Sequence, residues 1–217
     1  QQGPDTDIDP EISALMQALE EQDAASEEKE IAVVDAGVKD HRTLVEAAQE
    51  SGMEVILLSG KGDGVAEMAA GLEGRQNLDA IHVLSHGDTG QVTLGDTTLS
   101  TETLEDHAAA LETLGQALDS EGDLLLYGCR VGEGDTGRDF ITRVAEETGA
   151  DVAASDDITG NAGVGGDWDL ERETGDVAIP SIGPVAAFDK TLVSGTFDFE
   201  NVSGYGLYDW EDVQQTV

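Results

Sequence analysis

A histidine and the only cysteine of this 217-residue chain each follow an apolar run, in a turn that contains glycine. His86 comes directly after the run 78–85, and Cys129 comes two residues after the run 123–127. An imidazole within reach of a thiol can take its proton and later return it to a leaving amine. The backbone N–H groups of Gly87 and Cys129 could then stabilise an oxyanion. These residue types predict nucleophilic catalysis by a thiol if the fold brings His86 and Cys129 together.

The elements that must position these groups are visible as apolar runs separated by helical stretches. Uninterrupted apolar runs predict strands buried on both faces, and their alternation with helices is typical of βαβ units. The expected strands are 31–34, 54–58, 78–85, 123–127 and 151–154, and the expected helices are 41–50, 65–72, 101–118 and 137–148. The sequence therefore predicts an α/β fold with a mostly parallel sheet. Reactive groups collect at the carboxyl ends of such strands, so His86 and Cys129 should lie at the same edge.

The rest of the chain differs in character from this repeating pattern. The expected boundaries are 1–30 for an acidic linker or pro-segment, 31–180 for the α/β domain and 181–217 for an exit segment or the start of a next domain. After the fifth strand the chain becomes rich in glycine, and two short runs at 168–170 and 177–179 are expected to add edge strands.

The net charge limits the partners of the chain. Lys and Arg number 10 and Asp and Glu number 47, so the net charge is −37. A phosphate backbone or an anionic membrane surface would be repelled, and no apolar run approaches the roughly 20 residues that a membrane helix needs. We therefore expect no nucleic-acid partner and no membrane insertion. So acidic a chain is suited to salty water, where screening reduces its self-repulsion.

Three other kinds of site do not fit the sequence. The segment 128–132 has Cys129 at its second position, whereas a nucleophile elbow needs the nucleophile at its third. No Gly-x-Gly-x-x-Gly turn follows the first strand and no Walker loop is present, so no nucleotide or other organic cofactor is expected. The alternating acids of 5–9 precede Pro10 where a calcium loop needs glycine, so no metal site is predicted.

The motifs of the chain form a set that resembles a known family. They are Leu-Ser-His86-Gly87, the hairpin 91–99, Leu-Leu-Leu-Tyr-Gly128-Cys129, and the segments 149–155 and 165–171. Together they look like a bacterial domain of unknown function found near the N-terminus of giant cadherin-repeat and RTX-type adhesins. That domain is similar to caspases, metacaspases, gingipains and separase. The resemblance implies a caspase-like three-layer sandwich with His86 as general base and Cys129 as nucleophile. Tyr127 replaces a polar pocket residue of caspases, so caspase-type specificity is not expected.

The same resemblance implies a thiol endopeptidase inside a large secreted or cell-surface bacterial protein. It suggests that Asp35, or Asp156 with Asp157, lines the primary specificity pocket and favours a basic residue before the scissile bond. The partner would be a polypeptide substrate, and the parent chain is one candidate because Lys190 lies just beyond the expected core. We expect a latent monomer that needs no organic cofactor, with calcium as an activator by analogy with some relatives.

Two functions of other classes remain open. One is a non-catalytic domain of the same fold that serves adhesion, retention or assembly at the cell surface. The other is a flavodoxin-like ligand-binding domain. The relation between Cys129 and His86 discriminates among them, because an open cleft shared by both groups favours the enzyme. Burial of both under packed side chains favours the non-catalytic domain.

Overall fold

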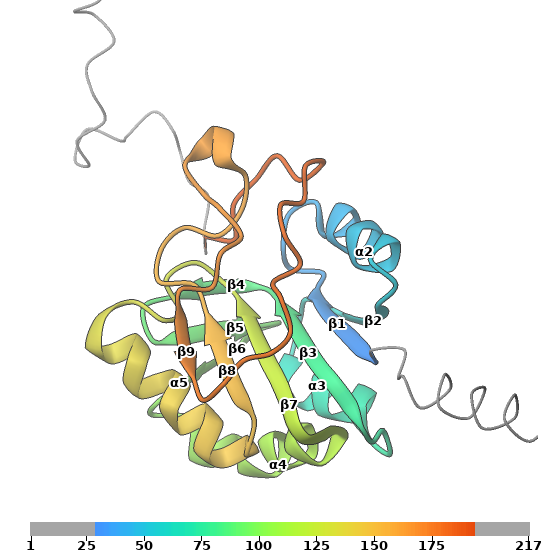
Figure 1. The fold of residues 1–217 in the computed structure, drawn as a ribbon, viewed down its shortest axis with the longest axis vertical. Coiled ribbons are helices and arrows are strands. Elements are labelled where there is room, and N and C mark those ends of the chain that lie inside the picture. Colours follow the sequence, from blue (N-terminus) through green and yellow to red (C-terminus); the bar gives the residue numbers. More distant parts are fainter. Residues whose placement is uncertain (1–28, 194–217) are drawn as a thin grey trace, which may run out of the picture.

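The computed structural model describes residues 29–193, and its central feature is a six-stranded sheet (Figure 1). The strands lie in the order β2-β1-β3-β7-β8-β9, and neighbours pair in parallel except for β8 with β9. Their bounds are Glu30–Asp35 for β1, Glu54–Leu58 for β2, Leu78–Leu84 for β3, Leu118–Tyr127 for β7, Asp151–Ala154 for β8 and Arg172–Thr174 for β9. The predicted mostly parallel α/β sheet is confirmed, and β3 lies beside β7 as expected.

Layers on both faces of the sheet make the fold a three-layer sandwich (Figure 1). On one face lie α3 (Gly64–Leu72), α4 (Ala108–Ala117) and α5 (Gly134–Thr148). On the other lie α2 (His41–Glu50) and the irregular chain that follows β8. None of the described helices is long and apolar enough to cross a membrane.

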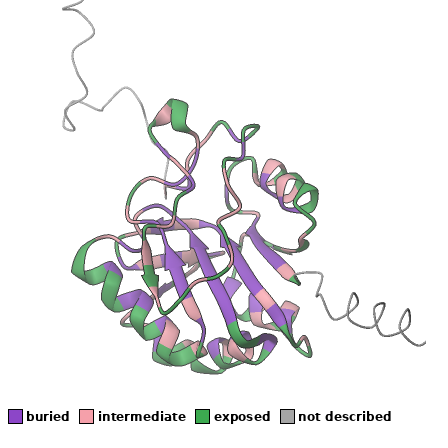
Figure 2. Ribbon diagram, viewed as in Figure 1, coloured by how far each residue is buried: buried purple, intermediate pink, exposed green. Residues whose placement is uncertain are grey.

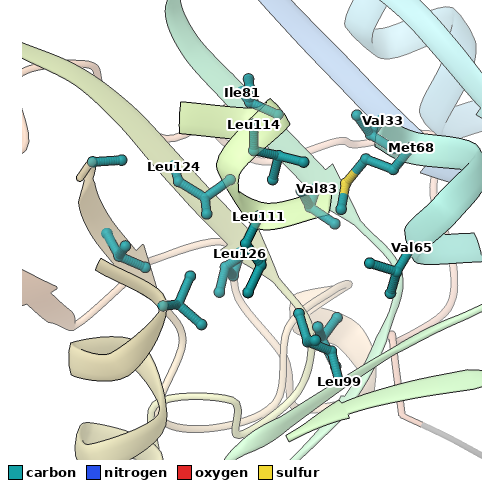
Figure 3. Packing of buried hydrophobic residues seen from close by; sticks show 14 of the residues in the cluster. Val33, Val65, Met68, Ile81, Val83, Leu99, Leu111, Leu114, Leu124 and Leu126 are labelled. Atoms are coloured by element: carbon teal, nitrogen blue, oxygen red, sulfur yellow. The ribbon is translucent and has the colours of Figure 1, made fainter. Parts of the chain in front are cut away.

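The alternation of side chains along each strand divides the apolar core into two clusters. Val83 and Leu126 point toward the three-helix face, where Leu111 and Leu114 of α4 cover them (Figure 3). Their neighbours in the strands, such as Leu125, point to the opposite face. The central strands are therefore buried on both faces (Figure 2), which accounts for the uninterrupted apolar runs in the sequence.

The helix predicted at 101–118 is shorter in the structure. Its first part is a 3-10 turn, η1 (Leu104–His107), and α4 begins at Ala108. The Thr103 hydroxyl accepts from the Ser100 N–H at 2.9 Å and donates to the Thr98 carbonyl at 2.9 Å. Such local bonds compete with helix formation. At the other end Leu118 leaves the helix because it pairs with Leu78 at the start of β7.

A small antiparallel sheet extends from the carboxyl end of β3. It consists of β4 (His86–Asp88), β5 (Gln91–Leu94) and β6 (Thr97–Ser100). The hairpin predicted in this region is confirmed as β5 and β6. Gly95 turns the chain between them with a φ of 60°, a value that glycine adopts without steric cost. Because β4 contains His86, this sheet fixes the backbone of the candidate catalytic base.

The two edge strands expected after the fifth apolar run are not formed, and β9 takes their place. β9 pairs antiparallel with β8, so the sheet gains an edge strand between the two predicted runs. The run at 177–179 is held instead by a side chain: Asp123 Oδ2 accepts the N–H groups of Ala178 and Ile179, each at 2.8 Å. A buried carboxylate on β7 therefore replaces strand pairing at this position.

The packed domain continues beyond residue 180, where the exit segment was expected to begin. Val185, Phe188 and Leu192 are buried in the same apolar cluster as Trp168. We call residues 185–193 the C-terminal strap, because they run across the sheet end on the α2 side (Figure 1). The expected segment 1–30 lies outside the described residues except for Lys29 and Glu30, as does the part of 181–217 after Val193.

Candidate functional site

His86 and Cys129 extend from the carboxyl ends of adjacent strands, as the sequence predicts. Leu84 of β3 pairs with Tyr127 of β7, and each candidate residue lies two positions beyond its member of that pair. The Ser85 N–H donates to the Tyr127 carbonyl at 3.2 Å, which prolongs the pairing toward the site. Parallel register at the sheet edge thus determines the placement of both groups.

A glycine lets the two turns approach each other closely. A Cβ at Gly87 would lie 2.8 Å from the Gly128 carbonyl carbon, 2.9 Å from the Cys129 oxygen and 2.6 Å from a methyl group of Val131. Only a residue without a side chain fits there. The Gly-Cys turn and the His-Gly strand are therefore in direct backbone contact, and any larger residue at position 87 would push them apart.

The thiol of Cys129 is fully buried and protonated. It donates to the Thr159 carbonyl at 3.6 Å, and its exposed fraction is 0%. Burial raises its pKa to about 11, although the backbone of Thr159 and then of Leu192 lowers it in part. Among residues 29–193, no hydrogen bond joins this thiol to His86. In this conformation the thiol is therefore bonded to the backbone of Thr159 and not to His86.

The residue after the cysteine has an unusual backbone. Arg130 has a φ of 62°, in the left-handed region that residues with a Cβ rarely occupy. Its N–H donates to the Asp157 carbonyl at 2.6 Å, and its guanidinium lies 3.4 Å from Asp88. Hydrogen bonding from a neighbouring loop therefore stabilises a sharp turn that directs Cys129 inward. Strained backbone of this kind clusters at functional sites.

His86 contacts the strap rather than the cysteine. Its Nδ1 lies 3.1 Å from the Leu192 carbonyl oxygen, which also accepts the Gly87 N–H at 3.3 Å. A carbonyl only accepts, so this contact requires a proton on Nδ1. Gly87 is one of the two predicted oxyanion donors, and in this structure it binds a peptide carbonyl. The other predicted donor, the Cys129 N–H, forms no hydrogen bond within the described residues.

The strap residues Lys190–Val193 lie between two walls, and the chain is extended from Thr191 to Val193. On one side Val193 forms a parallel bridge with Gly87, and on the other Thr191 forms an antiparallel bridge with Gly160. The Leu192 N–H donates to the Thr159 carbonyl at 2.9 Å. A Cβ at Gly160 would lie 2.5 Å from the Lys190 oxygen, and the φ of Gly160 is 138°. Each wall contains a glycine, Gly87 or Gly160, where the absence of a side chain leaves room for a peptide backbone.

Asp35 is placed at the end of β1, but its carboxylate is occupied by backbone and hydroxyl donors. Oδ1 accepts the Gly37 N–H at 2.7 Å, and Oδ2 accepts the Gly95 N–H at 2.8 Å and the Ser85 hydroxyl at 3.1 Å. The side chain is 2% exposed. The arrangement ties the ends of β1 and β3 to the β5–β6 turn, which is what a structural carboxylate does. Its predicted part in substrate selection stays a prediction.

Asp156 and Asp157 lie on the loop after β8, beside the site but with separate partners. Asp156 forms an ion pair with Arg172 at 2.7 Å. Asp157 belongs to an acidic group with Asp167 and Glu171, whose oxygens lie within 4.8 Å of one another. Burial, then the charges of Asp167 and Glu171, raises the pKa of Asp157. Within the described residues, these three carboxylates are the set with the spacing to hold a cation.

Tyr127, the residue that departs from the caspase pattern, belongs to a buried polar chain below the site. Strand alternation predicts a packed His82, and its ring is indeed fully buried, with Nε2 2.7 Å from Glu30 and Nδ1 3.2 Å from the Tyr127 hydroxyl. That hydroxyl accepts the Ile182 N–H at 2.8 Å. Burial raises the pKa of Tyr127, so the phenol stays protonated. Its role here is to anchor the chain that leads into the strap.

Four residues of the site were not among the sequence candidates: Thr159, Gly160, Asn161 and Leu192. The first three lie in the glycine-rich stretch after β8, and that enrichment was the available signal for a close backbone approach. No local pattern marks Leu192, because its place depends on packing against residues more than 100 positions earlier in the chain.

Comparison with known proteins places the chain in a family but gives it no activity. No curated protein matches the sequence. The solved structures that match include a putative aminotransferase from Corynebacterium diphtheriae, 13% identical with a TM-score of 0.32 over 60% of this chain. The chain spans 32% of that protein's length, and a likeness at this level bears on neither fold nor activity. A family model described as "Domain of unknown function (DUF4347)" matches residues 31–192. The chain therefore belongs to the DUF4347 family.

Proposed function

We propose that the domain is a cysteine endopeptidase in which Cys129 is the nucleophile and His86 the general base. One observation carries the proposal: an extended peptide, Thr191–Val193, lies across the site with its Leu192 carbonyl bound by His86 and Gly87. A site that holds a peptide carbonyl between an imidazole and an N–H donor has the groups that acyl transfer requires. The thiol lies beside the same peptide, since the Cys129 thiol and the Leu192 N–H both donate to the Thr159 carbonyl.

The setting of this activity is part of the same proposal. The substrate is a polypeptide, and the domain works as a monomer within a large secreted or cell-surface bacterial protein. This setting is supported by the adhesin-type resemblance of the motifs around His86 and Cys129. Calcium is an activator candidate, and the carboxylates of Asp157, Asp167 and Glu171 offer ligands for it.

A peptidyl electrophile tests the assignment directly. The full chain is incubated with a peptide chloromethyl ketone, with and without calcium, and the labelled residue is mapped by mass spectrometry. We expect labelling at Cys129 that is lost in His86→Ala and retained in the matched variant His107→Ala, because His107 lies on η1 away from the site. Equal labelling in both histidine variants would remove His86 from the mechanism.

A non-catalytic domain of the same fold is the second candidate, and one observation favours it. The Cys129 thiol donates to Thr159 instead of His86, and burial raises its pKa to about 11. If Cys129 resists the electrophile under every condition while denatured chain reacts normally, the thiol is a packed core residue. The domain then serves adhesion, retention or assembly.

A further inference from the structure

The hydrogen bonds of the strap give each of its residues a defined position in the site. The Asn161 N–H donates to the Lys190 carbonyl at 2.9 Å, and the Leu192 N–H donates to the Thr159 carbonyl at 2.9 Å. These two bonds connect alternate strap residues to one wall. The Gly87 N–H on the opposite wall binds the Leu192 carbonyl at 3.3 Å. Leu192 is therefore the strap residue whose backbone bonds to both walls, and its carbonyl also lies against His86.

The side chain of Leu192 fills an apolar subsite. It is 0% exposed, and it belongs to the cluster that contains Cys129, Trp168 and Phe188. Lys190 has the opposite environment: its ammonium pairs with Asp189, and about a third of its side chain is exposed. A subsite with these walls accepts an aliphatic side chain and opposes a charged one, because an unpaired charge is costly to bury.

We propose that Leu192 occupies the primary specificity subsite and that Cys129 cleaves the Leu192–Val193 bond of its own chain. The inference rests on the proposed peptidase function and specifies its substrate class, a polypeptide with leucine before the scissile bond. It differs from the expectation drawn from the resemblance, which was cleavage after a basic residue such as Lys190. For Lys190 to take this position the strap would have to shift by two residues and lose both bonds to Thr159 and Asn161.

The chemistry balances with the groups present. The thiol proton passes to His86, and the Cys129 thiolate adds to the Leu192 carbonyl carbon. The resulting oxyanion accepts the Gly87 N–H. The bond to the Val193 nitrogen then breaks, and His86 gives its proton to that nitrogen, which leaves a thioester on Leu192. Water adds to the thioester with His86 as base, which frees the Leu192 carboxyl group and restores the thiol.

Cleavage after Leu192 would release Val193 and the residues that follow it from the site. The Leu192 carbonyl is held by the site, whereas Val193 is joined to it through the bridge with Gly87. After cleavage Val193 and the residues that follow it leave the site, while Leu192 keeps its bond to Thr159 and carries the new carboxylate. The first turnover therefore frees the part of the groove beside Gly87 that Val193 occupied.

The test is the intact mass of the full 217-residue chain over time, with and without calcium, at low and high salt. We expect loss of the 25 residues from Val193 to Val217, and no such loss in Cys129→Ala. Leu192→Met should retain cleavage, and Leu192→Ala should slow it by at least roughly 10-fold, because even one missing methylene group in an apolar subsite has that effect. The matched variant Leu111→Ala removes a buried leucine from the other face and should cleave at the parental rate.

The outcomes separate this inference from the peptidase proposal. Cys129-dependent cleavage at another bond, such as release of Thr191–Val217, would support a peptidase and overturn the leucine assignment. Electrophile labelling of Cys129 without any self-cleavage would also overturn it and leave the peptidase standing. Absence of both labelling and cleavage under all conditions overturns both. If Leu192→Ala is cleaved after residue 192 as fast as the parent chain, the side chain at this position does not select the cleavage site.

Discussion

The Nδ1 atom of His86 lies 3.1 Å from the carbonyl oxygen of Leu192, a residue 106 positions later in the chain. The candidate base of the domain thus binds a peptide group that its own C-terminal strap supplies. Because Leu192 is also bound by Gly87 and Thr159, the strap blocks the approach of any other peptide to Cys129. The strength of strap packing should therefore control the reactivity of the thiol.

Weakening the strap should expose Cys129 without unfolding the domain. Phe188 is fully buried and packs edge-on against Trp168, with 5.8 Å between the ring centroids. Phe188→Leu removes a small part of a buried apolar side chain and should cost about 1 kcal/mol. If this cost lowers the free energy that keeps the strap closed, the fraction of molecules with an open strap rises about fivefold. We expect alkylation of Cys129 by iodoacetamide to accelerate by the same factor.

Phe140→Leu is the matched control for that experiment. Phe140 is also fully buried, but it lies on α5 in the cluster on the opposite face of the sheet. Its loss should lower the free energy of unfolding by a similar amount and leave the alkylation rate unchanged. Equal acceleration in both variants would mean that the thiol reacts through global unfolding, and the strap would not be a separate barrier.

Asp35→Ala should destabilise the fold and leave substrate preference unchanged. Three donors bind the carboxylate of Asp35, and two of them, Gly37 and Gly95, are backbone N–H groups. Leaving such donors without a partner costs about 1–3 kcal/mol each. We expect thermal denaturation to show a marked loss of stability. Two peptide electrophiles, one ending in leucine and one in lysine, should label Cys129 in the same order of rate as they do in the parent chain. A stable variant that loses a preference for lysine would restore Asp35 to a specificity pocket.

The sequence was sufficient to predict the five parallel strands of the sheet and the edge at which His86 and Cys129 lie. β3 and the second half of β7 are buried, mainly apolar runs, and their order along the chain with helices between them leaves few arrangements that bury both faces. The positions of His86 and Cys129 follow directly, because both lie just beyond the carboxyl ends of these strands. The predicted helix at 101–118 was partly wrong, since α4 begins at Ala108 and Leu118 pairs with Leu78 in the sheet.

The part of the site that could not be predicted depends on long-range packing. Leu192 has no neighbouring motif, and only the folded chain shows that it reaches His86. Asp123 gave no signal either, because a buried carboxylate that binds two backbone N–H groups looks in sequence like any other acid among 47. For the same reason an acid such as Asp35 at a strand end could not be distinguished from a substrate-binding carboxylate.

Salt should stabilise the domain and increase the reactivity of Cys129. The net charge of −37 produces repulsion within the folded chain and a negative potential that opposes formation of a thiolate. The Debye length falls from roughly 10 Å at 0.1 M to roughly 3 Å at 1 M salt, so both effects weaken over that range. We expect the melting temperature and the alkylation rate to rise together in sodium chloride. A melting temperature that stays flat or falls would contradict the first half of this prediction.

The buried thiol should make the stability of the domain depend on pH in the alkaline range. Burial raises the pKa of Cys129 from 9.0 to about 11, so between these values the unfolded chain loses a proton that the folded chain retains. Because the native state then binds more protons, the free energy of unfolding falls as pH rises through this window, by up to about 1.4 kcal/mol for each pH unit. Below pH 9 both states keep the proton and the thiol contributes no pH dependence.

Cys129→Ala isolates this contribution from that of other groups. Tyr127 also has a raised pKa through burial, but it is present in both proteins and cancels in the comparison. Urea unfolding of the two proteins from pH 8 to pH 11 should therefore give stabilities whose difference is constant at first and then shrinks or reverses in favour of Cys129→Ala. Parallel curves across the whole range would mean that Cys129 ionises as readily in the folded chain as in the unfolded one. The strap would then not seal the thiol from water, and the latency attributed to it would need another cause.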